Sequence, residues 1–124
     1  MSGFLPVARR LLLAIAALSL AACVTTPRSL YAWGNYEELI YASNAKPGSL
    51  TPEAQADQME RDRQEAEAAA RRLPPGWHAQ LGSLYAQSGR IDLAEQELLA
   101  EKAAFPESAT LMDRLLANLR KAAP

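Results

Sequence analysis

The stretch Pro74–Ser108, PPGWHAQLGSLYAQSGRIDLAEQELLAEKAAFPES, decides the fold of this chain. Its first half places five residues on one face of a helix: Trp77, Leu81, Leu84, Tyr85 and Ser88. Gly89 suits the left-handed residue that ends such a helix. A second helix, from about Ile91 to Ala104, would bury Ile91, Ala94 and Leu98, with Phe105 as a further candidate. The stretch therefore predicts two antiparallel helices.

This helix pair resembles the unit of a tetratricopeptide-type repeat. Leu81, Gly82 and Tyr85 occupy the positions that the repeat gives to leucine, glycine and tyrosine. Ala94 lies at the close-packing point of the second helix, and Pro106 ends the unit. The resemblance is clear in the second half of the chain and degenerate in the first half.

Two residues depart from the repeat pattern. His78 stands at the tryptophan position, since Trp77 comes one residue early, and Glu101 stands where the repeat usually has alanine. An unpaired buried carboxylate is costly. We therefore expect Glu101 to contact His78 or a backbone group if it is buried.

Helices are also predicted on both sides of this pair. Upstream, Thr51 is a cap, Pro52 suits the first helical position, and one helix is expected from Glu53 to Leu73. Downstream, Ser108 is a plausible cap of the last helix. That helix carries the strongest apolar face in the chain: Leu111, Met112, Leu115, Leu116 and Leu119. The predicted fold is all-α, built from antiparallel, tetratricopeptide-like helix pairs.

The helix expected over 53–73 is mostly charged. Its thin apolar stripe consists of Met59, Ala66, Ala69 or Ala70, and Leu73. Three pairs have the spacing of helix-surface ion pairs: Asp57 with Arg61, Glu60 with Arg63, and Glu67 with Arg71. The pattern is typical of a solvated face, and a partner-recognition surface is the alternative.

Aromatic residues open the domain. Trp33, Tyr36 and Ile40 are spaced to share one helical face, which Leu39 and Tyr41 flank. These rings either supply core to a small domain or form a patch at a lipid or partner surface.

The N-terminus predicts a lipoprotein signal. Basic Met1–Arg10 and an apolar run to Leu20 precede Leu20-Ala21-Ala22-Cys23, which resembles a bacterial lipobox. The resemblance implies that the Cys23 sulfur receives diacylglycerol and that cleavage makes Cys23 the acylated N-terminus. We therefore divide the chain into a signal peptide over 1–22, a lipidated tether over 23–30 and a helical domain over 31–124. The tether reaches at most about 25 Å.

Composition excludes several functions. Without the signal, the chain has 11 basic and 14 acidic residues, a balance that argues against nucleic acid as a partner. His78 is the only histidine and Cys23 is assigned to lipid, so no Cys/His metal site is expected. We find no phosphate-binding glycine loop and no nucleophile–base motif. The sequence predicts neither a cofactor nor an enzyme.

Three segments resemble a known family: YAWGNYEELIY, PPGWHAQLGSLYAQSG and EKAAFPES. They are similar to small Gram-negative outer-membrane lipoproteins defined by a domain of unknown function, and the resemblance covers nearly the whole mature chain. It implies an outer-membrane lipoprotein without enzymatic activity. It also implies that the gene lies in the same neighbourhood as the genes of a curli-secretion-channel-like lipoprotein and of another small lipoprotein.

These observations predict a lipid-anchored adaptor or assembly factor of the cell envelope, on the periplasmic side of the outer membrane. Its partner, for which another envelope lipoprotein is a candidate, would bind a groove lined by small and polar residues: Ala79, Ser83, Ala86, Gln87, Asp113, Ala117 and Arg120. Two alternatives stay open. One is a scaffold or activator of cell-wall enzymes, and the other is a structural lipoprotein that packs on the membrane through Tyr31 and Trp33.

Overall fold

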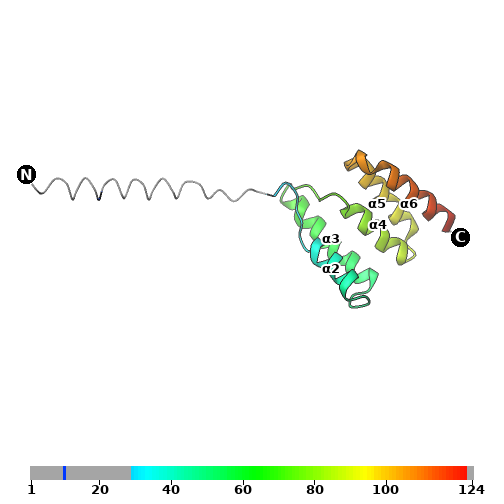
Figure 1. The fold of residues 1–124 in the computed structure, drawn as a ribbon, viewed down its shortest axis with the longest axis horizontal. Coiled ribbons are helices and arrows are strands. Elements are labelled where there is room, and N and C mark those ends of the chain that lie inside the picture. Colours follow the sequence, from blue (N-terminus) through cyan, green and yellow to red (C-terminus); the bar gives the residue numbers. More distant parts are fainter. Residues whose placement is uncertain (1–9, 11–28, 123–124) are drawn as a thin grey trace, which may run out of the picture.

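The computed structural model describes Arg10 and residues 29–122. In this part of the chain the fold is all-α, as predicted, with five α-helices and one 3-10 turn. The elements are α2 (Tyr36–Ala45), α3 (Pro52–Ala68), α4 (Trp77–Gln87), α5 (Ile91–Ala104), η1 (Pro106–Ser108) and α6 (Ala109–Ala122). Figure 1 shows α2 and α3 side by side at one end of the domain, and α4, α5 and α6 stacked at the other.

The α4–α5 pair follows the predicted boundaries. Gly89 joins the two helices with a φ of 73°, as expected for a left-handed helix stop. Gly82 allows the close approach of the helices, because a Cβ at this position would lie 3.1 Å from the carbonyl oxygen of Ala94. The sequence therefore placed this helix pair correctly.

The charged helix α3 is shorter than predicted. Thr51 caps it, accepting a hydrogen bond from the Ala54 amide at 3.2 Å. The helix ends at Ala68, however, and Ala70 adopts a φ of 50°. The expectation that it continues to Leu73 was wrong. Leu73 precedes a proline, and the residue before proline is disfavoured in the helical region.

Only part of the predicted surface pairing forms along α3. Glu60 and Arg63 pair at 3.1 Å. Arg71 lies beyond the end of the helix, so it cannot pair with Glu67 across a helical turn. Met59 and Ala66 of the predicted stripe are buried, as expected, whereas Ala69 and Ala70 are exposed.

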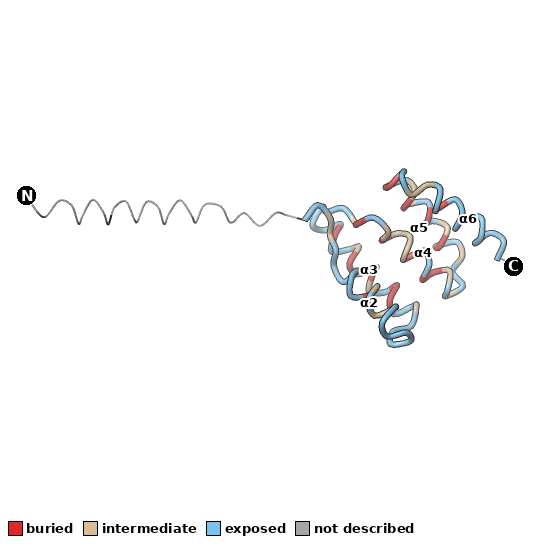
Figure 2. Tube along the Cα trace, viewed as in Figure 1, coloured by how far each residue is buried: buried red, intermediate tan, exposed pale blue. Residues whose placement is uncertain are grey.

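One apolar core runs through all five helices. The buried residues of this core come from every helix from α2 to α6: Leu39, Ala56, Met59, Trp77, Leu81, Leu84, Tyr85, Ala94, Leu98, Met112, Leu116 and Leu119. Figure 2 shows buried segments on the sides of the helices that face one another and exposed segments along their outer sides. Since Trp77, Met59 and Leu81 are completely enclosed, α3 and α4 meet at the centre of this core.

The helix α6 is only half covered. Met112 and Leu116 are buried, but Leu111 and Leu115 remain 54% and 36% exposed. The five residues that the sequence predicted as the strongest apolar face of the chain are therefore only partly buried. A stripe that wide needs neighbours on two sides, and within the part of the chain described here α6 packs chiefly on α5.

The aromatic and apolar residues at the start of the domain lie partly in the core and partly on the surface. Helix α2 begins at Tyr36, so Trp33 lies before it and does not share its face, contrary to the prediction. Asp62 fixes this start by accepting hydrogen bonds from the Asn35 amide and side chain, both at 2.9 Å. Leu39 is the residue of α2 that becomes buried, while Tyr41 is 67% exposed.

Candidate partner-binding surface

A buried polar cluster lies where α3, α4 and α5 meet. One Glu97 oxygen accepts a hydrogen bond from Arg63 Nη2 at 2.7 Å, and the other accepts one from His78 Nδ1 at 2.7 Å. Burial alone would raise the pKa of Glu97, but the bonds from His78 and Arg63 outweigh it and lower the pKa below its usual 4.5. The cluster therefore holds a charged carboxylate between three helices.

Arg63 and Tyr85 extend this cluster towards Glu60. The Arg63 guanidinium lies 5.2 Å from the centre of the Trp77 ring and also contacts Glu60. The Tyr85 hydroxyl donates a hydrogen bond to Glu60. Burial, together with this bond, raises the pKa of Tyr85 to about 12. Each of these polar groups thus has a partner on a neighbouring helix.

Glu101 follows the expectation drawn from the sequence. It is 2% exposed, and its Oε1 accepts a hydrogen bond from the Gly76 amide at 2.7 Å. The backbone contact is therefore the one that forms, and His78 pairs with Glu97 instead. Gly76 has a φ of 86°, and the bond to Glu101 fixes this turn at the start of α4.

The buried carboxylates of Glu97 and Glu101 have a structural role. Both oxygens of Glu97 are engaged by cations or donors, and the Glu101 carboxylate holds a backbone amide. Among the described residues, no group of three or more histidine, cysteine, aspartate or glutamate side chains is arranged to hold a metal ion.

On α4, the predicted groove residues differ in exposure. Ser83 and Gln87 are exposed and adjacent, with Gln87 Nε2 donating to the Ser83 carbonyl oxygen at 3.2 Å. Ala79 and Ala86 are half-buried and pack against the core. Of these four residues, only Ser83 and Gln87 are therefore exposed.

On α6, the predicted residues lie on a different side of the helix. Asp113 pairs with Lys102 at 2.5 Å, and Arg120 pairs with Glu95. Both partners belong to α5, while Ala117 is exposed. The structure therefore groups Asp113 and Arg120 with α5 and does not bring them together with Ser83.

One edge of the apolar face of α6 carries two exposed leucines. Since Asp113 and Arg120 mark the edge of the helix that faces α5, Leu111 and Leu115 border the opposite edge of the buried stripe. Ala79 and Ala86 of α4 pack into the same core as Met112 and Leu116 of α6. We call Ser83, Gln87, Leu111 and Leu115 the α4–α6 face. The width of the apolar stripe on the last helix was the signal for this face in the sequence.

A recess adjoins the α4–α6 face. It has a volume of about 300 Å³ and lies between the α2–α3 turn and α4. Gln80, Leu84 and Gln87 line it from α4, and Ser43 and Gln55 line it from α2 and α3. Gln87 therefore belongs both to this recess and to the α4–α6 face.

Cys23, the predicted lipidation site, lies outside the described residues. No helix within the described part of the chain is both long and apolar enough to span a membrane.

Comparison with known proteins identifies the family. No curated protein and no solved structure matches the chain significantly. A family described as "Domain of unknown function (DUF4810)" matches residues 30–115, which include α2 to α5 and the first half of α6. The chain therefore belongs to the DUF4810 family.

Proposed function

We propose that this protein is a lipid-anchored adaptor of the outer membrane, which faces the periplasm and binds a protein partner in an envelope or surface-export assembly. The lipobox at Leu20–Cys23 supports the anchor. The α4–α5 pair, with Gly82 at the close approach and Gly89 at the turn, supports a tetratricopeptide-like unit. In such repeats, exposed helix surfaces bind peptides or partner helices.

The α4–α6 face carries this proposal. Leu111 and Leu115 are exposed leucines on a helix whose remaining apolar residues are buried. On α4, Ser83 and Gln87 supply exposed hydrogen-bonding groups. An apolar strip flanked by polar groups fits an amphipathic helix or an extended peptide with two or three apolar side chains.

The test is capture of bound proteins from gently extracted envelopes with wild type and two variants. Ser83→Trp fills the α4–α6 face, and we expect it to lose the partner while its thermal unfolding stays unchanged. Gln96→Trp is the control, since Gln96 is an exposed residue of α5 outside this face. Retention of the same partner by Ser83→Trp would refute the assignment of the face.

The anchor is tested separately. Mass spectrometry of the mature protein should find an acylated N-terminal Cys23, and Cys23→Ser should release the protein from the membrane fraction. An unmodified Cys23 in the membrane-bound protein would contradict the anchor and leave the partner-binding proposal intact.

A further inference from the structure

Residues 29–32 are hydrogen-bonded to the turn that follows α3. The Ala32 amide donates to the Arg72 carbonyl oxygen at 2.8 Å. Arg71 Nη2 donates to the carbonyl oxygens of Ser29 and Tyr31, at 3.1 and 2.5 Å. The chain therefore leaves the domain from a fixed point beside both arginines.

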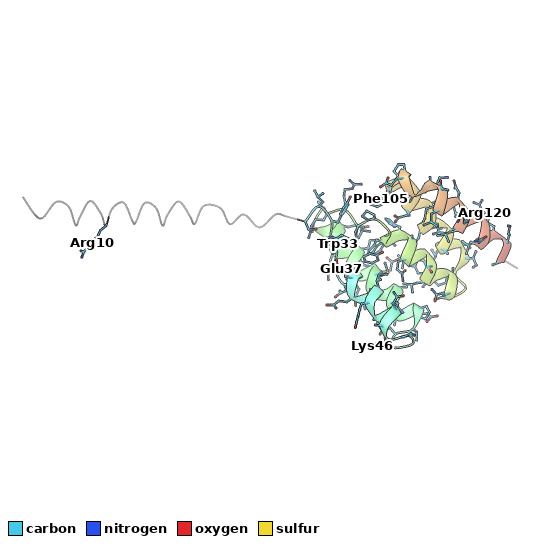
Figure 3. All side chains as sticks on the ribbon, viewed as in Figure 1. Arg10, Trp33, Glu37, Lys46, Phe105 and Arg120 are labelled. Atoms are coloured by element: carbon cyan, nitrogen blue, oxygen red, sulfur yellow. The ribbon has the colours of Figure 1, made fainter. Side chains whose placement is uncertain are left out.

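The surface around this point combines two arginines with exposed apolar side chains. Leu30 is 83% exposed and Trp33 is 39% exposed, and both arginines are exposed. Leu30, Arg71 and Arg72 line one open recess of about 810 Å³. We call Leu30, Trp33, Arg71 and Arg72 the arginine end. Figure 3 shows Trp33 at one end of the domain and Arg120 at the other.

The two guanidinium groups keep their charge available. Arg72 lies 5.9 Å from the ring centres of both Tyr31 and Phe105, and Arg71 bonds only to carbonyl oxygens. Within residues 29–122, neither arginine forms an ion pair. Arg71 also lines a smaller recess that carries Asp62 and Glu65, and Asp62 is already engaged by Asn35. The arginine end is therefore a positive surface with apolar side chains.

This combination matches the surface of a phospholipid membrane. Arginine is attracted to anionic headgroups, tryptophan prefers the interface, and an exposed leucine gains from contact with acyl chains. The position also matches, because five residues separate Ser29 from Cys23. A segment of this length reaches at most about 25 Å, so an anchor on Cys23 would hold the arginine end close to the bilayer.

We infer that the arginine end seats the domain on anionic phospholipid and so sets its orientation on the membrane. This inference rests on the proposed lipid anchor and goes beyond it, because an anchor alone leaves a domain free to rotate about its tether. Helix α6 then extends away from the bilayer, since the C-terminal end of the domain lies opposite the point of chain entry (Figure 1). The α4–α6 face would be accessible to a periplasmic partner.

The experiment uses the mature lipidated protein, reconstituted into vesicles of phosphatidylcholine and phosphatidylglycerol with brominated acyl chains. Tryptophan emission is measured, and Trp33→Phe supplies the background of Trp77, which is fully buried. We expect quenching in the wild type and none in Trp33→Phe. The attraction of two arginines to an anionic surface should favour the seated orientation over the free one by roughly 30-fold. The double variant Arg71→Glu/Arg72→Glu should therefore lose most of the quenching.

Three further variants separate charge from folding. Lys46→Glu/Lys121→Glu makes the same charge change elsewhere on the domain and should leave the quenching unchanged. Arg71→Lys/Arg72→Lys keeps the charge and should retain most of it. Leu30→Ser should lower the quenching without any change in circular dichroism, because the leucine side chain is almost fully exposed.

Each contrary outcome has a distinct meaning. Failure of the wild type to float with vesicles would overturn the anchor and this inference together. Normal flotation with Trp33 unquenched, or with quenching that charge reversal does not change, would overturn the inference alone. It would also be overturned if Trp33 were shielded from iodide in native envelopes but accessible in vesicles, because a protein would then cover the arginine end.

Discussion

Glu97→Gln tests whether the polar cluster holds α3, α4 and α5 together. The substitution keeps the size of the side chain but removes the charge that Arg63 and His78 share. Both hydrogen bonds to the carboxylate measure 2.7 Å, and the Glu97 side chain is 10% exposed. The variant leaves the partly buried Arg63 guanidinium without the negative charge of its main partner.

The expected loss of stability follows from this burial. Removing one partner of a fully buried ion pair costs about 3–5 kcal/mol. Here the Arg63 side chain is 24% exposed and that of His78 is 18% exposed, so water compensates for part of the loss. We therefore expect a cost of about 2 kcal/mol, which lowers the melting temperature of a domain of this size by roughly 10 °C.

The dependence on pH gives a second signature. The pKa of Glu97 is lower in the folded protein than its ordinary value of 4.5, because bonds from His78 and Arg63 outweigh the effect of burial. The unfolded chain therefore takes up this proton at higher pH. The stabilisation is complete above the unfolded pKa and is lost as the pH falls through the lower, folded pKa. The Glu97→Gln variant should lack this part of the acid dependence.

The assay is urea unfolding followed by circular dichroism, at neutral pH and between pH 3 and 5. Glu95→Gln is the control, since the exposed pair of Glu95 with Arg120 should contribute less than about 1 kcal/mol. Equal stabilities for Glu97→Gln and Glu95→Gln, or the same acid dependence in Glu97→Gln as in the wild type, would refute the role given to the cluster.

Three shorter predictions concern α4, its turn and its start. Burial and the bond to Glu60 raise the pKa of Tyr85 to about 12, so the stability it contributes should be present below pH 10 and lost as the pH rises towards 12. Tyr85→Phe should remove this alkaline loss in urea titrations. Gly89→Ala should cost about 1 kcal/mol through backbone strain alone, since φ is 73° and no heavy atom lies within 4 Å of the added Cβ; a cost above about 3 kcal/mol would contradict the open turn. Glu101→Ala should cost about 2 kcal/mol by leaving the Gly76 amide unpaired, whereas Glu101→Gln should retain most of the stability, and equal losses in thermal melts would exclude that contact.

The sequence predicted the structure correctly where the structure depends on residues that are close along the chain. The apolar spacing of Trp77, Leu81 and Leu84, and the glycine at position 89, act within one or two helical turns, and the structure has the predicted helix pair. Thr51 capped its helix as expected for the same reason. The end of α3 was missed because Ala70 has no special propensity for its φ of 50°.

Contacts between helices were less predictable. His78 and a backbone group were the two partners expected for Glu101, and the backbone contact forms. His78 pairs with Glu97, which lies one helical turn away on the same side of α5, and sequence spacing does not distinguish the two carboxylates. Leu111 and Leu115 have the periodicity of core residues. Their exposure depends on how many helices pack around α6, which is a property of the whole domain.

The most direct test of the adaptor account is photo-crosslinking in living cells, with a benzophenone amino acid at Ser83 and, in a matched strain, at Gln96. The account predicts one discrete protein adduct from Ser83 and none from Gln96, with the Ser83 adduct lost when Leu115→Glu is added. The account would be contradicted by adducts of equal yield from both positions, or by a Ser83 adduct that persists with Leu115→Glu.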